Sequence, residues 1–435
     1  MASKIKVDTL ETANGSGSIT INNPINTAGI TSVTLGTSNF VAGVNAGNSI
    51  TSGGDNNTAV GDEAGTAITT GDRNTLIGKQ SGSAITTGGN NTAVGYNTLS
   101  ANTLADRNVA IGEGSLKTLN VTSNADTYNT GVGFNSGASI TTGVQNTLIG
   151  ALAGDAITTG GSNTASGYLA LSANTTGTEN LAAGFNALND NTTASYNTAL
   201  GSQSMGLNTT GHSNTATGNS SLYSNTTGIQ NTAFGRSALT NNTTASENTA
   251  VGEQCLTANT TGTGNCGLGR QALNNNTTAS SNTGMGLYAL YANTTGSNNT
   301  AFGRSASEGN TTANSNTSIG YQALKQTTTG ASNVAVGADA LTDNTTGTNN
   351  TAVGKSALEV NTTGQQNTAI GPSAGHKVTT GVANTCVGYV SGNTLTTGSN
   401  NVFIGRAAGA SVTSDSSQLY IARDNTGVGN AATWI

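Results

Sequence analysis

A short motif of alternating polar and apolar residues recurs along most of this chain. It reads Asn-Thr-Ala-h-Gly, where h is a large apolar residue, and its glycine falls at Gly61, Gly78, Gly95 and Gly112 and then every 17 residues from Gly133 to Gly405. An asparagine stands four residues before each of these 21 glycines. Positions are counted from the motif glycine, which is position 0, so that this asparagine is at position −4.

The alternation inside the motif predicts one short β-strand in every copy. Position −1 is bulky and apolar in 18 of the 21 copies, position −2 is usually Ala and position −3 is usually Thr. Successive residues of a strand face opposite sides, so the threonine and the bulky residue share one face. If the bulky residues fill the interior, the alanines line an outer surface.

The constant phase of Asn and Gly predicts an all-β fold, a parallel β-solenoid (β-roll) with one 17-residue copy per turn. Stacked turns repeat the same backbone conformation, so a residue with special backbone requirements recurs at each turn. Gly adopts positive φ easily, and Asn can bond the Asn of the next turn. The expected structural ladder includes Asn57, Gly61, Asn74, Gly78, Asn91, Gly95, Asn231, Gly235, Asn350 and Gly354.

The second half of the repeat shows a correlated choice between two positions. In seven copies position +4 is Gly and position +7 is Ile, Val or Leu, as in Gly65 with Ile68. In twelve copies position +4 is Leu, and in ten of these position +7 is Asn, as in Leu171 with Asn174. One aliphatic group per turn from either position indicates a shared interior of constant volume.

The repeat divides the chain into three parts. We expect an N-terminal attachment segment at 1–38, a solenoid with degenerate terminal copies at 39–422, and a C-terminal tail at 423–435. The one 21-residue spacing places four extra residues within Leu119–Tyr128, where we expect a loop that leaves the register intact. Four charged residues within Lys4–Glu11 favour attachment of the first segment to a larger assembly.

Composition excludes several classes of function. Charged residues make up 8% of the chain and the net charge is −6, without a basic patch for nucleic acid. No apolar stretch is long enough to span a membrane, and residues 1–11 have no apolar core typical of a signal peptide. These features favour synthesis in a cytoplasm. Cys255, Cys266 and Cys386 occupy three different repeat positions and are interpreted as small apolar residues.

The sequence offers no catalytic, metal or cofactor site. His212 and His376 are the only histidines, lie 164 positions apart and have no nucleophile partner pattern, so we expect both to be exposed. Asp62 and Glu63 are adjacent, and adjacent strand residues face opposite ways. We therefore predict a protein without enzymatic activity.

Among the positions that carry large side chains, position +1 varies most in residue type from copy to copy. Aromatic residues and Arg are common in recognition surfaces, although a contact rim between chains would also account for them. The candidates for surface recognition or an interchain rim are Tyr96, Phe134, Tyr168, Phe185, Arg236, Arg270, Arg304, Tyr321 and Tyr389. A host-surface glycan or protein is the external partner that such a surface would suit.

Self-association is expected because each turn offers only about two large aliphatic groups, worth roughly 4 kcal/mol, against the chain entropy of 17 residues. An outer column of alanines would allow close approach of other chains. We therefore predict a homotrimer held by the alanines at position −2.

The motif resembles the head repeat of trimeric autotransporter adhesins. Asn108-Val109-Ala110-Ile111-Gly112 and Asn333-Val334-Ala335-Val336-Gly337 come nearest to that family's signature, whereas most copies here have Thr in place of the first Val. The resemblance covers residues 39–422 and implies trimers of parallel β-rolls.

A second resemblance is to repeat-rich tail-fibre and appendage proteins of marine bacteriophages. It rests on the Asn-Thr-Ala-h-Gly and Asn-Thr-Thr-Gly runs, on Ser3–Leu10, and on Leu419–Arg423 and Asn430–Ile435. It implies a structural fibre of a virion, made in the host cytoplasm, that contacts other virion proteins through its N-terminal segment. A bacterial surface adhesin is the alternative, and an ice-binding solenoid is a third possibility because threonines recur regularly.

Overall fold

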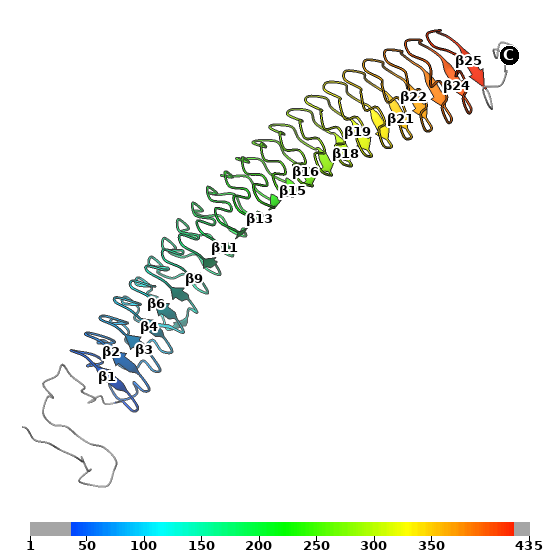
Figure 1. Cartoon of the computed structure of the whole chain (residues 1–435). Helices are drawn as coiled ribbons and strands as arrows, with labels where there is room; N and C mark the ends of the chain where they lie inside the picture. The colour runs from blue at the N-terminus through cyan, green and yellow to red at the C-terminus, as the bar shows by residue number, and fades with distance from the viewer. Residues whose placement is uncertain (1–35, 422–435) are drawn as a thin grey trace, which may run out of the picture. The chain divides into compact units, whose positions relative to one another are not determined.

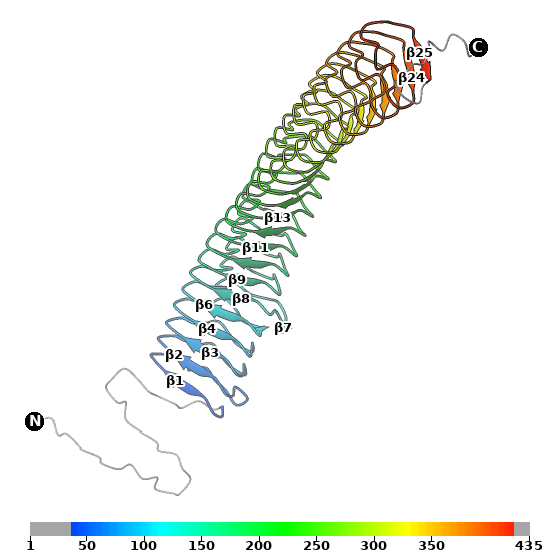
Figure 2. The same cartoon turned by 45° about the vertical axis from the view of Figure 1, so that its right-hand side comes forward.

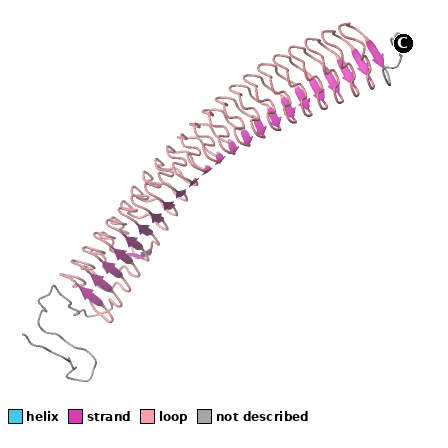
Figure 3. Ribbon diagram, viewed as in Figure 1, coloured by secondary structure: helices cyan, strands magenta, loops and turns pink. Residues whose placement is uncertain are grey.

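The computed structural model describes residues 36–421, which form two units, 36–145 and 146–421. Most of the expected attachment segment at 1–38 and the tail at 423–435 lie outside the described residues. Within the described residues all regular secondary structure is β-strand, as Figure 3 shows. Each unit is a parallel β-solenoid (Figure 1), which confirms the predicted fold class.

The first unit contains two sheets of parallel strands. Its main ladder pairs successive turns, and a second, two-stranded sheet lies beside it (Figure 2). The strands of the main ladder are β1 (Phe40–Ala42), β2 (Thr58–Val60), β3 (Thr75–Ile77), β4 (Thr92–Val94), β6 (Val109–Ile111) and β8 (Thr130–Val132). The small sheet pairs β5 (Ala105–Asp106) with β7 (Ala125–Asp126).

The second unit is one uninterrupted ladder in which each strand pairs with the strand 17 residues further on. Its strands are β9 (Thr147–Ile149), β10 (Thr164–Ser166), β11 (Leu181–Ala183), β12 (Thr198–Leu200), β13 (Thr215–Thr217), β14 (Thr232–Phe234), β15 (Thr249–Val251), β16 (Cys266–Leu268), β17 (Thr283–Met285), β18 (Thr300–Phe302), β19 (Thr317–Ile319), β20 (Val334–Val336), β21 (Thr351–Val353), β22 (Thr368–Ile370), β23 (Thr385–Val387), β24 (Val402–Ile404) and β25 (Leu419–Ile421). The degenerate copies at the two ends of the repeat form β1 and β25.

Hydrogen bonds join neighbouring turns far beyond the three-residue strands. Leu239 donates its backbone N–H to Cys255 O of the next turn at 3.0 Å, and Thr243 donates to Thr260 O at 3.2 Å. Glu247 donates in the opposite direction, to Ile229 O of the preceding turn at 3.1 Å. The stacked backbone therefore supplies cohesion that the small apolar interior cannot provide alone.

The side chains at position −2 point inward, so the expected outer column of alanines is wrong. Ala199, Ala233 and Ala250 are completely buried, whereas Phe234 at position −1 is 55% exposed. The reason is the narrow interior of a 17-residue turn. A Cβ added at Gly267, which occupies position −2, would lie 2.3 Å from Cys255 Sγ of the opposite wall. Where the opposite wall carries Leu at position +4, only a small residue fits at position −2.

The predicted exchange of volume between positions +4 and +7 is visible in the interior. Ile68 is fully buried, and a Cβ added at Gly65 would lie 2.7 Å from its Cδ1 atom. The same glycine makes room at position −2, since Leu76 lies between Gly65 and Gly82 and would contact an added Cβ at 2.8 and 2.7 Å. Where position +4 is Leu, its side chain is buried, and Asn occupies position +7 in ten of these twelve copies.

Two buried columns of asparagine amides run along the stack. At position −4, Asn74 donates its Nδ2 to Asn57 Oδ1 at 3.1 Å and to Gly88 O at 2.9 Å. At position +7, Asn191 donates its Nδ2 to Asn174 Oδ1 at 2.9 Å and to Ala194 O at 3.0 Å. Each of these side-chain amides thus forms a hydrogen bond with the asparagine of the adjacent turn. The interior therefore contains polar groups, but most of them are hydrogen-bonded.

The four-residue insertion leaves the register intact, as expected. Strand β8 pairs with β6 at an offset of 21 residues, Val109 with Thr130. Ala125 and Asp126 pair with the identical dipeptide Ala105-Asp106 of the preceding turn. This pairing places three extra residues between Asn120 and Ala125 and one between Asp126 and Asn129. Leu119 remains fully buried before them.

Candidate recognition surfaces

The nine candidate residues at position +1 all lie on the surface, just after the turn made by the motif glycine. The aromatic members of this column are 45–54% exposed. Arg236, Arg270 and Arg304 are also exposed. The structure brings together only those candidates that stand in adjacent turns, because one position recurs once per turn.

Neighbouring aromatic and cationic groups pair along this column. The rings of Tyr168 and Phe185 stack with centroids 5.9 Å apart and planes at 16°. Arg304 lies 6.0 Å from the ring centre of Tyr321, and Arg406 lies 5.9 Å from that of Tyr389. Part of the aromatic and guanidinium surface is therefore already engaged within the chain.

One segment of the same column is an ionic ladder. Glu253 forms an ion pair with Arg236 of the preceding turn, and its Oε2 lies 3.5 Å from Arg270 Nε of the next turn. The hydrogen bond and charge of Arg236, and then the charge of Arg270, hold the pKa of the Glu253 carboxyl below its usual value. This contribution to stability is present above the carboxyl's unfolded pKa and is lost as the pH falls through the lowered value. All three groups are exposed, so the ladder stabilises the fold only slightly.

The outward strand face, defined by positions −3 and −1, is the main apolar surface. It carries threonines beside aliphatic and aromatic side chains in successive turns. The large exposed residues at position −1 are Ile77, Ile111, Ile149, Phe234, Leu268, Phe302, Ile319, Ile370, Ile404 and Ile421. A regular apolar column of this kind is typical of a surface that contacts another molecule.

The paired threonines of the repeat divide into two columns with different roles. At position +8 the hydroxyl bonds the next turn, as Thr192 Oγ1 does to Thr209 O at 3.1 Å. At position +9 the side chain is exposed, and threonine recurs there in fifteen consecutive turns from Thr159 to Thr397. The sequence shows the threonine pairs but does not tell which threonine of each pair is exposed. The reason is that the backbone around them is neither helix nor regular strand.

The groups that could support catalysis are dispersed or shielded. Burial raises the pKa of the Cys255 and Cys386 thiols to about 12, which leaves both as unreactive thiols at neutral pH. His212 is exposed, with Nδ1 3.1 Å from Ser213 Oγ, whereas His376 is only partly exposed, with Nδ1 3.4 Å from Glu359 Oε2. Residues 36–421 contain no cluster of three or more His, Cys, Asp or Glu side chains able to hold a metal ion.

Within the same described range, no helix has the length and apolar character needed to cross a membrane. No protein-family model matches the chain, and no curated protein sequence matches it.

Proposed function

We propose that this chain is a structural fibre subunit of a bacteriophage virion, a tail fibre or surface appendage, that acts as a rigid spacer and takes part in host attachment. The observation that carries this proposal is the uninterrupted, hydrogen-bonded stacking of turns of one length and one backbone conformation. In the second unit alone, seventeen strands lie in one ladder, which at about 4.8 Å per strand extends roughly 80 Å.

Two further features support a spacer. The buried side chains of the described residues belong to the repeat itself, so the interior is occupied by packing and amide ladders. The exposed surface, in contrast, varies from turn to turn at position +1. A rigid body with a variable surface suits a protein that holds a contact point away from a particle.

We further propose that the fibre is a homotrimer in which the outward strand faces of three chains meet. We propose this face as the interface in place of the alanines at position −2, because those alanines are buried within each chain. Every chain presents the same 17-residue period, so apolar columns of two chains match turn for turn. Threefold closure hides one such face from each chain.

The direct test of the function is detection of the chain in purified virions by mass spectrometry and immunogold labelling. We expect labelling of a thin projection, and loss of that projection when the gene is deleted. A chain that lacks residues 1–38 should still fold, as judged by circular dichroism, but should be missing from particles. Absence of the protein from purified particles would contradict the virion assignment. Normal incorporation of the truncated chain would contradict the attachment role of residues 1–38.

The exposed threonine column gives specific support to a second candidate, an ice-binding solenoid. An ice-binding face requires threonine in the same column on every turn, and position +9 meets this over fifteen turns. Thermal hysteresis of the purified protein tests it, and its absence removes this candidate. A bacterial surface adhesin, the other alternative, predicts labelling of bacterial envelopes in place of virions.

A further inference from the structure

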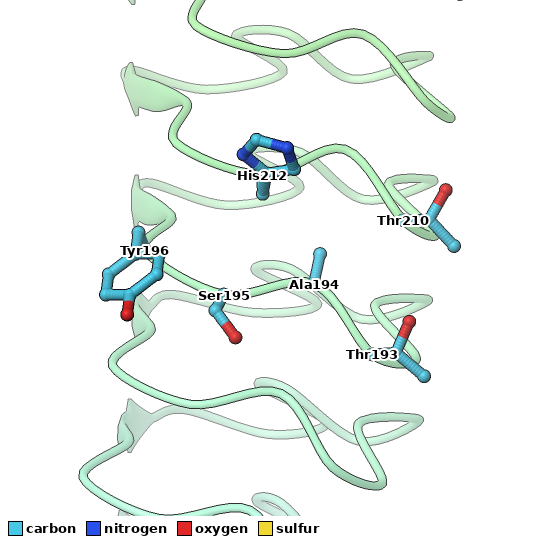
Figure 4. Close-up of a pocket in the computed structure, with 6 residues that line it drawn as sticks. All are labelled: Thr193, Ala194, Ser195, Tyr196, Thr210 and His212. Carbon is cyan, nitrogen blue, oxygen red and sulfur yellow. The ribbon is translucent and has the colours of Figure 1, made fainter.

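We propose that a hollow on the surface of the second unit binds one unit of a neutral glycan. The hollow is lined by Thr193, Ala194, Ser195, Tyr196, Thr210 and His212 (Figure 4). This inference deepens the proposed role in attachment, because it names the chemical class of a ligand and the residues that would hold it. It concerns positions +9 to +12, a part of the surface that the position +1 candidates do not include.

The hollow spans two consecutive turns. One turn contributes Thr193 to Tyr196, and the next contributes Thr210 and His212 at the equivalent positions +9 and +11. Figure 4 shows the two threonines at one end, Tyr196 at the other and His212 above Ala194 and Ser195. The hollow has a volume of about 320 Å³, at the lower end of the range of roughly 300–1,000 Å³ found for ligand sites.

Tyr196 supplies an exposed aromatic surface. Its side chain is 59% exposed, while its backbone is anchored by a 3.2 Å hydrogen bond from its N–H to Thr178 O. Position +12 is small in the following turn, where Ser213 stands. The tyrosine ring is therefore open on that side, and its electron-rich face can attract the C–H groups of a pyranose.

Hydroxyl groups that line the hollow are available for hydrogen bonds. Thr193 and Thr210 make no side-chain hydrogen bond among the described residues, in contrast to the position +8 threonines, whose hydroxyls donate to the next turn. Ser195 Oγ accepts a bond from Thr178 N at 2.9 Å and keeps its own proton for donation. A hollow that combines hydroxyl groups at one end with an aromatic ring at the other fits a polyhydroxylated ligand.

The charge of the site selects against acidic glycans. The lining contains no Lys or Arg that could neutralise a uronate, sialate or phosphate. In the position +12 column, the residue one turn before Tyr196 is Glu179, which would repel an anion. A neutral saccharide is therefore the favoured ligand.

The experiment is a binding assay with the full chain on an array of neutral hexasaccharides (maltohexaose, cellohexaose, laminarihexaose and mannohexaose) and acidic hexauronates. Calorimetric titration follows for each sugar that binds. We expect at least one neutral hexasaccharide to bind with a Kd below about 1 mM, and the acidic set to bind at least about tenfold more weakly. Tyr196→Ser, which places the residue of the next turn at this position, should weaken binding about tenfold or more. Thr210→Val should weaken it about threefold.

The matched control is Tyr128→Ser, which removes another exposed tyrosine that directly precedes a position −4 asparagine and lies outside the hollow. It should leave binding unchanged, and circular dichroism should show that all three variants keep the fold. The proposal is overturned if no neutral hexasaccharide binds, if the acidic set binds as well, or if Tyr196→Ser retains the affinity of the unsubstituted chain. These outcomes are separate from the fibre assignment, which depends on the presence of the chain in virions.

Discussion

At the residue scale, each turn depends on four positions with positive φ. In the turn that begins at Gly235 these are Gly235 itself with φ 133°, Ser237 with 57°, Leu239 with 52° and Glu247 with 62°. The last three are held in the left-handed helical region at a cost of about 1 kcal/mol or more each. Hydrogen bonds to the adjacent turns offset this cost, which explains why such residues recur at the corners of every turn.

The first prediction concerns the motif glycine. Gly235→Ala should destabilise its turn by at least about 3 kcal/mol, because the φ is strained for alanine and the new Cβ would lie 2.6 Å from Gly252 O. Thermal melting and local hydrogen exchange measure this. Gly264→Ser is the control, since an added Cβ there meets nothing closer than 4.0 Å and position +12 accepts other residues in the left-handed region. Equal melting of both variants would contradict the argument.

The second prediction concerns a defect in the position +7 amide column. Asn310 Oδ1 is buried without a hydrogen-bond partner among the described residues, and Thr327 follows it in the column in place of Asn. Thr327→Asn should add the missing bond and stabilise the local structure by about 1–2 kcal/mol. Slower hydrogen exchange around 307–344 would show the gain.

Asn225→Thr provides the reciprocal variant for this test. It interrupts an intact part of the column, where Asn225 Nδ2 donates to Asn208 Oδ1 at 2.8 Å, and should destabilise by a similar amount. If both substitutions change exchange in the same direction, amide stacking is not the cause.

At the scale of elements, a turn tolerates extra residues only where its ends keep their hydrogen bonds. Asn120 donates its N–H to Thr141 O at 2.9 Å, and Asn129 donates its N–H to Asn108 Oδ1 at 3.0 Å. The inserted residues lie between these two anchors. The insertion therefore changes the length of a corner and leaves the strands on either side in register.

The third prediction follows from the position of the extra residues on the two sides of Ala125-Asp126. Deletion of Val121–Ser123 together with Thr127 should restore a 17-residue turn and shift the melting temperature by no more than about 2 °C. The Thr127 hydroxyl bonds Asn108 Oδ1 at 2.8 Å, and a side-chain amide makes the equivalent contact in regular turns. A much larger loss of stability would show that the loop and the Arg107–Asp126 ion pair clasp this region.

At the scale of the whole molecule, the facing of the strands decides which residues can form an interface. The bulky residues at position −1 are outside and the alanines at position −2 are inside. Substitutions at these two positions should therefore have different effects. Charges at position −1 act on association, whereas charges at position −2 act on folding.

The fourth prediction is that Phe234→Lys, Leu268→Lys and Phe302→Lys together convert a trimer into folded monomers. Sedimentation should give three times the 42.8 kDa chain mass for the unsubstituted protein and a single chain mass for the variant, with unchanged circular dichroism. Ala233→Asp should instead reduce the β-sheet signal, because it buries an unpaired charge. A stable unsubstituted monomer at micromolar concentration ends the trimer proposal.

The sequence alone determined the features that depend on one turn stacking on another of the same kind. The 17-residue period, the strand at Asn-Thr-Ala-h-Gly, the turns at Gly61 and its equivalents, and the exchange between Gly65–Ile68 and Leu171–Asn174 pairs were all readable. A residue that must repeat its conformation or fill a fixed volume leaves a phase-locked pattern. This pattern can be recognised in the sequence without knowledge of the path that the chain follows in three dimensions.

Only the tertiary structure decided which way the side chains face. Alternation separates Ala233 from Phe234 but does not tell which of them is inside, because that depends on the distance between opposite walls of the turn. The wall opposite Ala233 belongs to positions +3 and +4, and the left-handed residues at positions +2 and +4 leave the backbone there without a regular period. For the same reason the exposed threonine column and the hollow beside Tyr196 were not predictable, since both combine side chains of adjacent turns at irregular corners.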